Sequence, residues 1–280
     1  MNKINSVEMN AALIPPPKMR YQAMGPAGLN DLVVDLRQCG HVRLEADFFS
    51  ADFKEVNECN VVFSGTCKLD WKGKRHDLKA GHLYLFPGFQ RRKTYACDRL
   101  EKLFFHFRLL YRGIDLFRDA EPLALPFPKG FETITSRSRE AMERGDLFAS
   151  KAALLESLAP FQTAIGKILS KKTPAYQKHE SFFQLVETRI RSELEIGEAA
   201  QLAGRTEKAF AADFKKSFGL SPKQFFLREK TRRIQEVLTH TDLPAGKIAE
   251  DFGFTDAFYF SRFFKKMSGL TPMDYRRQSR

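Results

Sequence analysis

The chain has 280 residues, which is enough for about two domains of ordinary size. Its 43% hydrophobic and 29% charged residues are typical of a globular protein and leave little room for long disordered tracts. Lys and Arg number 46 against 34 Asp and Glu, and the resulting net charge of +12 favours a polyanionic partner. The excess is spread along the chain, because residues 176–280 hold 19 basic and 14 acidic residues, so composition alone does not locate a binding surface.

The sequence offers neither a signal peptide nor a membrane span. Met1 to Gln22 lacks a sustained apolar region, and no window reaches the roughly 18 apolar residues that a bilayer requires. The cysteines form no C-x-x-C pair and show no zinc-like spacing to histidines; they are Cys39, Cys59, Cys67 and Cys97. We therefore expect a cytoplasmic protein with reduced cysteines.

The first elements in chain order are an arm and a set of strands. Residues 1–24 contain Pro15-Pro16-Pro17, which favours extended polyproline structure. Over residues 25–130, short apolar runs alternate with turn signals at Ser64-Gly65, Lys72-Gly73, Ala80-Gly81 and Pro87-Gly88. The predicted strands are Asn60–Phe63, Thr66–Trp71, Arg75–Leu78, His82–Phe86 and Leu103–Leu109. Their spacing predicts an antiparallel barrel or sandwich, and a closed barrel would leave no exposed edge.

Residues 131–172 change to a helical period. The apolar stripe consists of Leu154, Leu158, Phe161, Ile165 and Ile168. Pro160 lies inside it and predicts a kink or a split into two helices. The stripe either packs on its own domain, the alternative that we favour, or pairs with a second subunit. Residues 173–178, which begin with Thr173-Pro174, are predicted to be a linker.

Residues 179–280 are predicted to be helical throughout and contain an internal repeat of 50 residues. FKKSFGLSPKQF, residues 214–225, aligns with FKKMSGLTPMDY, residues 264–275. Both copies contain an N-cap followed by proline at the first helical position, at Ser221-Pro222 and Thr271-Pro272. Such agreement in register indicates two copies of one structural unit.

Upstream of each repeat copy the sequence predicts a helix, a turn and a second helix. A small residue, a glycine and an N-cap mark them: Ala200, Gly204 and Thr206 in the first copy, and Ala249, Gly253 and Asp256 in the second. This is the layout of a helix-turn-helix unit, whose second helix enters the major groove of DNA. A phenylalanine-rich helical bundle with external lysines is the structural alternative, but the repeat, the caps and the two FKK runs favour DNA binding.

The two recognition helices are predicted over residues 206–217 and 256–266. Their inward positions are Phe210, Phe214, Phe260, Phe263 and Phe264. Arg262 is the best candidate for a guanine contact, because its planar fork matches O6 and N7. Lys265 and Lys266 suit phosphates. Ala212 aligns with Arg262 and offers only a methyl group, so the first unit should discriminate bases less.

The segment from Ile248 to Arg276, IAEDFGFTDAFYFSRFFKKMSGLTPMDYR, resembles the second helix-turn-helix signature of the AraC/XylS family, and the resemblance covers about residues 179–277. It implies an α+β multidomain protein. An N-terminal cupin-like β-barrel with helices would bind an effector and dimerise, and a C-terminal all-α domain of about seven helices would bind DNA.

The resemblance also implies which residues contact DNA and what else the protein binds. The base-contacting positions of the family fall on Lys208, Ala211, Ala212, Ala257, Phe258, Ser261 and Arg262, while Lys215 and Lys216 can hold phosphates. Phe258 either contacts a thymine methyl group or is partly buried. The implied partners are double-stranded DNA, a small-molecule effector, a second copy of the chain and, as a further candidate, RNA polymerase.

The N-terminal half can be a sensor, an enzyme or a scaffold. Its histidines, His41, His76, His82 and His106, form no H-x-H followed by a spaced carboxylate, so we expect no metal, no cofactor and no catalytic residues. An effector site would use an aromatic platform and hydrogen-bonding groups suited to a sugar or similar polar metabolite, provided by Trp71, His82, Gln90, Arg91 and His106. The alternative for these residues is plain core.

Two other functions stay open at this point. One is an architectural DNA clamp without an effector, and the other is a barrel metalloenzyme fused to a DNA-binding domain. A DNA-repair methyl acceptor needs an activated cysteine, and residues 179–280 contain no cysteine. The expectation is therefore a transcription regulator and not an enzyme.

Overall fold

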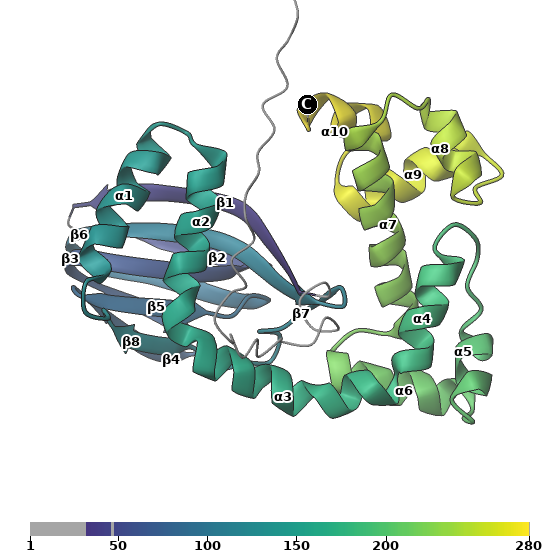
Figure 1. Ribbon diagram of the computed structural model, residues 1–280, viewed down its shortest axis with the longest axis horizontal. Coiled ribbons are helices and arrows are strands. Elements are labelled where there is room, and N and C mark those ends of the chain that lie inside the picture. Colours follow the sequence, from purple (N-terminus) through teal and green to yellow (C-terminus); the bar gives the residue numbers. More distant parts are fainter. Residues whose placement is uncertain (1–31, 46–47, 280) are drawn as a thin grey trace, which may run out of the picture.

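The computed structural model describes residues 32–45 and 48–279 (Figure 1). The predicted arm, residues 1–24, lies outside them. The first half of the described chain is an antiparallel sheet and the second half is helical. The sheet has eight strands: β1 (Leu32–Leu44), β2 (Ser50–Lys54), β3 (Asn57–Trp71), β4 (Lys74–Lys79), β5 (His82–Phe86), β6 (Gln90–Tyr111), β7 (Ile114–Asp115) and β8 (Leu123–Pro126).

The two longest strands, β3 and β6, form the centre of the sheet. The strand order is β1-β6-β3-β5-β8, and β2 and β7 pair with β6 while β4 pairs with β3. Within the described residues no pairing joins β1 to β8, so the structure shows an antiparallel sheet but not the predicted closed barrel. Closure stays a prediction.

A bulge bends the central strand pair and explains why one turn prediction was wrong. Ser64-Gly65, expected to be a turn, lies inside β3, which joins two of the predicted strands. Gly65 has a φ of +72°, and a Cβ there would lie 2.3 Å from the backbone oxygens of Asp98 and Arg99 on β6. The register between β3 and β6 shifts on both sides of Ser64. The glycine therefore bends a continuous strand instead of ending it.

Helices α1 (Phe131–Glu143) and α2 (Leu147–Leu158) cover one face of the sheet (Figure 1). The predicted apolar stripe packs here on its own domain, with Leu154, Leu158 and Phe161 buried against Phe105 and Phe107 of β6. A second core, around Trp71, Phe86 and Leu100, fills the opposite face.

Pro160 splits the helical stretch as predicted. A single 3-10 turn, η1 (Ala159–Phe161), separates α2 from α3 (Gln162–Lys178). The linker predicted over residues 173–178 is instead the end of α3, with Pro174 inside the helix. The hydroxyl of Thr173 donates to the carbonyl of Leu169, and Tyr176 is buried in the core of the first helical unit. This packing holds the helix together despite the missing amide hydrogen of the proline.

The remaining helices are α4 (Glu180–Arg189), α5 (Ile196–Leu202), α6 (Glu207–Phe218), α7 (Pro222–His240), α8 (Ala245–Asp251), α9 (Ala257–Ser268) and α10 (Pro272–Gln278). These seven helices lie within residues 179–280, for which the sequence predicted about seven, and the described part of the chain has ten α-helices in all, α1 to α10. None of the described helices has the length and apolar content that crossing a bilayer requires.

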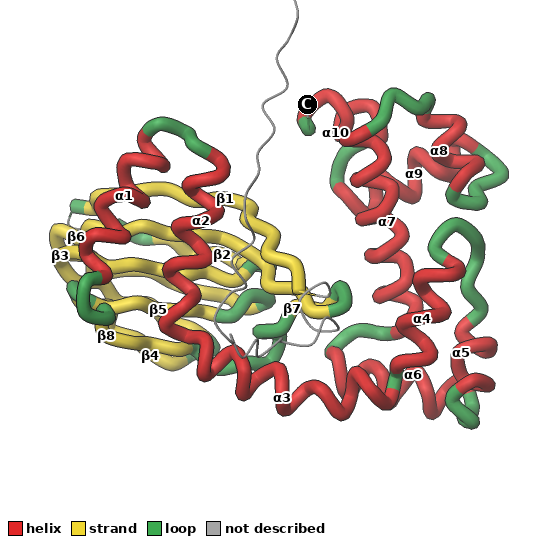
Figure 2. Tube along the Cα trace, in the orientation of Figure 1, coloured by secondary structure: helices red, strands yellow, loops and turns green. Residues whose placement is uncertain are grey.

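The helical half contains two cores, and α7 contributes side chains to both. In Figure 2, α7 runs from the group of helices with α4, α5 and α6 to the group with α8, α9 and α10. Phe225, near the start of α7, belongs to a core with Phe182 and Phe214. Ile234, two to three turns further along, belongs to a core with Phe260 and Phe264. Each repeat copy is therefore a separately packed unit, and α7 fixes the distance between the two units.

Candidate nucleic-acid interface

The first helix-turn-helix unit consists of α5, a short turn and α6. Gly204 has a φ of +62° in the turn, a conformation that glycine adopts without strain. Thr206 caps α6 by accepting a hydrogen bond from the amide of Ala209 at 3.3 Å. Ala200 is 2% exposed where the two helices pack together, as its small size predicted.

The second unit repeats this arrangement with α8 and α9. Asp256 caps α9 by accepting from the amides of Phe258 and Tyr259 at 2.9 and 3.0 Å. Gly253 has a φ of +73°, and a Cβ there would lie 3.0 Å from the carbonyl oxygen of Arg191. Any side chain at this position would therefore strain the turn and press on the segment after α4.

The inward faces of the two recognition helices are buried as the sequence predicted. Phe210 and Phe214 of α6, and Phe260 and Phe264 of α9, are each at most 1% exposed, and Phe263 is half-buried. Because these rings fix the rotation of each helix, they also determine which residues face outward.

The predicted DNA-contacting residues lie on the outward faces. Ala211 and Ser261 are half-buried at the margins. The other predicted contact residues are exposed: Lys208, Ala212, Lys215, Lys216, Ala257, Phe258, Arg262, Lys265 and Lys266. Phe258 is 81% exposed, so of its two predicted environments the structure shows the solvent-facing one.

The basic side chains on these faces lack acidic partners in the described part of the chain. They are Lys208, Lys215, Lys216, Arg262, Lys265 and Lys266. Of the two acidic residues of α6, Glu207 is in the first turn, and Asp213 faces away from these lysines, where Lys178 and Arg205 bind it at 2.8 and 2.9 Å. The hydrogen bond from Lys178 lowers the pKa of the Asp213 carboxyl below its ordinary value. The outward faces thus carry uncompensated positive charge suited to phosphates.

Tyr259 belongs to the same surface, although the sequence did not single it out. It is 55% exposed in the first turn of α9, next to Phe258, and its ring packs on Phe254 with centroids 5.9 Å apart. The early residues of a recognition helix face base edges. The signal in the sequence was its position directly after a predicted contact, but the apolar period of the helix alone did not separate it from the core.

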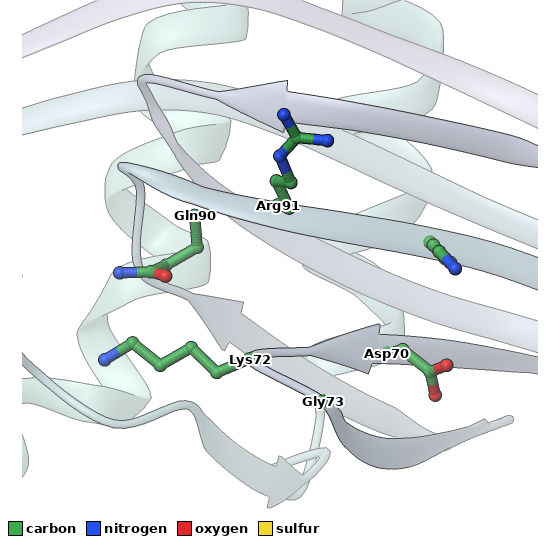
Figure 3. Close-up of a pocket in the computed structure, with 6 residues that line it drawn as sticks. Asp70, Lys72, Gly73, Gln90 and Arg91 are labelled. Atoms are coloured by element: carbon green, nitrogen blue, oxygen red, sulfur yellow. The ribbon is translucent and has the colours of Figure 1, made fainter.

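The predicted effector residues do not form one group. Gln90 and Arg91 line a depression of about 430 Å³ together with Asp70, Lys72, Gly73 and Lys93. In Figure 3 the amide of Gln90 and the ammonium group of Lys72 lie on the same side of it. This is a shallow, polar and mostly cationic site on the sheet.

The other three predicted residues lie outside that depression. Trp71 is 1% exposed and its Nε1 donates to the carbonyl of Pro87 at 3.3 Å, so it is part of the core and not an exposed platform. His82 contacts the carbonyl of Ala80 at 3.0 Å. His106 lies 3.1 Å from Gln38. Strand register, which one sequence does not fix, separates these side chains.

The sheet also contains a buried polar cluster that was not predicted from the sequence. Arg92 donates to Glu58 at 2.6 Å, and Lys102 donates to Asn60 at 2.6 Å and lies 3.4 Å from Glu58. Burial alone would raise the pKa of the Glu58 carboxyl, but Lys102, His106 and Arg92 hold it well below its ordinary value. The ion pairs compensate charges that are almost fully buried.

The histidines do not gather into a metal site. Among the residues that the structure describes, no group of three or more His, Cys, Asp or Glu side chains is arranged to hold a metal ion. His41, for example, lies 2.9 Å from a single carboxylate, that of Glu101.

Comparison with known proteins gives a family match in the helical half. A family model described as a helix-turn-helix domain matches residues 199–278. The chain is 30% identical over 91 residues to the MmsAB operon regulatory protein of Pseudomonas aeruginosa, covering 32% of this chain and 30% of that protein. It is 26% identical over 139 residues to the Msm operon regulatory protein of Streptococcus mutans, covering 50% and 48%. The chain thus matches 30% to 48% of the length of these relatives.

Among solved structures, fatty-acid-bound ToxT from Vibrio cholerae aligns with 89% of this chain, and 96% of its own chain is covered. The sequence identity is 13% and the TM-score is 0.42.

Proposed function

We propose that this chain, which belongs to the AraC family of helix-turn-helix transcriptional regulators, reads a specific DNA sequence with α6 and α9. The observation that carries the proposal is the pair of outward faces described above. Each recognition helix packs the phenylalanines of its inward face into the core and exposes uncompensated lysine or arginine side chains on its outward face. In this function the base-reading residues are those predicted from the sequence, with Arg262 as the main one and the lysines as phosphate contacts.

The length of α7 supports an arrangement with the two units in successive major grooves. Its 19 residues span roughly 28 Å at 1.5 Å per residue, somewhat less than the ~34 Å turn of straight B-DNA. We therefore expect modest bending of bound DNA, and a bend near zero in a gel-shift phasing assay would contradict this part of the proposal.

The two units differ in what they offer to DNA. Arg262 of α9 has Ala212 as its counterpart on α6, so the first unit presents a methyl group where the second presents a guanidinium group. The second unit is therefore expected to do most of the reading, while the first mainly binds phosphates through Lys215 and Lys216.

In this proposal the sheet half binds a small polar effector that controls DNA binding, and the protein works in the cytoplasm as a homodimer. Residues 25–130 are assigned to the effector, 131–172 to packing or dimerisation, and 179–280 to DNA, with RNA polymerase as a candidate further partner. The depression with Asp70, Lys72, Gln90 and Arg91 provides hydrogen-bonding and charged groups that suit a sugar or a similar polar metabolite.

The test is selection of random duplex DNA by the full chain, followed by affinity measurements at two salt concentrations. A recovered motif that is more strongly constrained at one end, bound with steep salt dependence, supports a regulator whose second unit does most of the reading. Strong binding without any enriched sequence would contradict sequence-specific reading and favour an architectural clamp.

A further inference from the structure

Arg118 of the sheet half makes a hydrogen bond with the end of the first recognition helix. It lies in the connection between β7 and β8, and its Nη2 donates to the carbonyl oxygen of Gly219 at 3.0 Å. Gly219 caps the C-terminal end of α6, with a left-handed φ of +72°. The carbonyl groups at the end of a helix have no partner within the helix and carry partial negative charge. A guanidinium group is therefore a favourable partner at this position.

The repeat provides an internal comparison for this contact. Helix α9 ends in the same way at Gly269, which has a φ of +86°. A Cβ at Gly219 would lie 2.5 Å from the Nε of Arg118, whereas a Cβ at Gly269 would meet no described atom within 4 Å. Among the described residues, the sheet half therefore reaches the capping glycine of the first recognition helix and not that of the second.

Arg118 is itself held in place by contacts of its side chain and of its backbone. The guanidinium group lies 4.6 Å from the centroid of the Phe89 ring, in a cation-π contact. The carbonyl oxygen accepts a hydrogen bond from the Nζ of Lys172 at 2.8 Å, and the amide donates to the carbonyl of Asp115 at 3.2 Å. The preceding residue, Phe117, is fully buried in the core of the sheet half. The position of Arg118 is therefore determined by the sheet half and α3, and not by α6.

Gly219 is connected directly to the turn of α6 that carries two of the predicted phosphate-binding lysines. Its amide donates to the carbonyl oxygen of Lys215 at 2.8 Å. Lys215 and Lys216 belong to this last turn, and both are exposed. Two residues beyond Gly219, Ser221 begins the capping box of α7. The backbone of Gly219 therefore determines how the last turn of α6 meets α7.

We propose that Arg118 is a positioning residue for DNA binding by the first helix-turn-helix unit. By holding Gly219, it keeps the last turn of α6 in the orientation in which Lys215 and Lys216 contact phosphates. The inference rests on the proposed function for the contact between α6 and DNA. The hydrogen bond to Gly219 is exposed to solvent, so its loss should weaken DNA binding by a moderate factor, on the order of threefold to tenfold.

The test replaces Arg118 by methionine in the full chain and measures the affinity for a duplex DNA by fluorescence anisotropy at a series of salt concentrations. Methionine keeps an apolar stem against Phe89 but cannot donate to Gly219. The slope of log affinity against log salt decreases in magnitude by about 0.9 for each phosphate contact that is lost, so Arg118→Met should reduce it by up to about two. Arg118→Lys keeps a charged donor and should recover most of the slope. An unchanged slope in Arg118→Met overturns the proposal.

Combined variants distinguish positioning from a direct contact between Arg118 and DNA. If Arg118 acts through the two lysines, Arg118→Met should have no further effect in a chain that already carries Lys215→Ala and Lys216→Ala. In a chain with Lys265→Ala and Lys266→Ala, on the second unit, its effect should be complete. Unchanged binding in the first background would also show that Arg118→Met is folded. A further loss of affinity in that background overturns the proposal.

Arg99→Met is the matched control for the removal of one positive charge from the sheet half. Arg99 is on β6, its side chain is 83% exposed, and it pairs with the adjacent Asp98. Its affinity and salt slope should equal those of the wild type. Phosphate contacts do not depend on sequence, so any duplex can be used. A wild-type chain that binds DNA without selecting a sequence would contradict the proposed function, while the effect of Arg118→Met on its salt slope would still decide this inference.

Discussion

The guanidinium group of Arg112, in the turn between β6 and β7, donates to both carboxylate oxygens of Glu180, the first residue of α4. The next residue, Gly113, faces α7, where a Cβ would lie 2.4 Å from the Oε1 of Glu229. Ile114 follows and is 2% exposed within the core of the first helix-turn-helix unit. The end of the sheet is therefore built into the first unit, while the second unit depends on α7 for its position.

We call the contact between the end of the sheet and the first helix-turn-helix unit the joint, and we expect Glu180→Gln to weaken it. The hydrogen bonds from Arg112 lower the pKa of the Glu180 carboxyl in the folded protein. The ion pair therefore stabilises the fold fully at pH values above the ordinary carboxyl pKa, and this stabilisation is lost as the pH falls through the lowered pKa of the folded state. The side chain is 40% exposed, so the loss at pH 7 should be at most about 1 kcal/mol. Urea unfolding at several pH values measures it.

The matched control for this joint is Glu187→Gln on the same helix, at an exposed carboxylate without an ion pair in the described part of the chain. Its free energy of unfolding should follow that of the wild type. The difference between wild type and Glu180→Gln should close as the pH falls toward ~3. A difference that persists there would mean that packing, and not the ion pair, stabilises the joint.

We expect Phe258→Ala and Phe260→Ala to separate DNA contact from core packing on one helix. Phe258 is 81% exposed, so its removal should leave the free energy of unfolding nearly unchanged but weaken operator binding by about 1 kcal/mol through a lost apolar contact. Phe260 is 1% exposed, and its truncation should cost about 3–5 kcal/mol of stability. Thermal unfolding and gel-shift affinity measure the two effects, and unchanged operator binding by folded Phe258→Ala would contradict its placement at the DNA.

The features that the sequence predicted are those carried by local chemistry. The caps at Thr206 and Asp256 and the glycines at positions 204 and 253 act over three or four residues, so both recognition helices could be located from the residues alone. The contact between Arg112 and Glu180 joins residues 68 positions apart, and no periodic pattern indicates it. Contacts of this kind arise only from tertiary packing, so they could not be predicted from the sequence pattern.

The errors at the sheet have a related cause. Trp71 was expected at an open mouth, but a shift of one residue in strand register moves a side chain to the opposite face, and here it is buried. Gly65 was expected to end a strand, but its positive φ serves a bulge in a strand pair that only the fold brings together.

We expect Arg262→Ala and Lys265→Ala to affect DNA binding in different ways. Loss of a bidentate guanine contact should cost about 1–3 kcal/mol and relax the preference at one base pair. Loss of a phosphate contact should weaken all sequences alike and reduce the slope of log affinity against log salt by about one. Both side chains are exposed and without an ion pair among the described residues, so neither change should alter folding. If both variants bind the selected operator normally, the recognition helix of the second unit is placed wrongly.

Asp115, in β7 beside the joint, should make the stability of the protein depend on pH in the opposite sense to Glu180. It is 6% exposed and accepts hydrogen bonds from Asn57 Nδ2 at 2.8 Å and from the amide of Phe117 at 2.9 Å. Burial raises the pKa of its carboxyl to about 6, more than these hydrogen bonds lower it. The folded state therefore binds more protons than the unfolded state between about pH 4 and pH 6.

The free energy of unfolding should consequently fall as the pH rises through that window, by about 3 kcal/mol for a shift of two pKa units. Asp115→Asn removes the titration, so the stability of the wild type relative to this variant should decrease from pH 4 to pH 7. Urea unfolding of both proteins across that range measures the difference. A difference that is constant with pH would show that Asp115 is ionised in the folded protein at all these values, with its hydrogen bonds outweighing its burial.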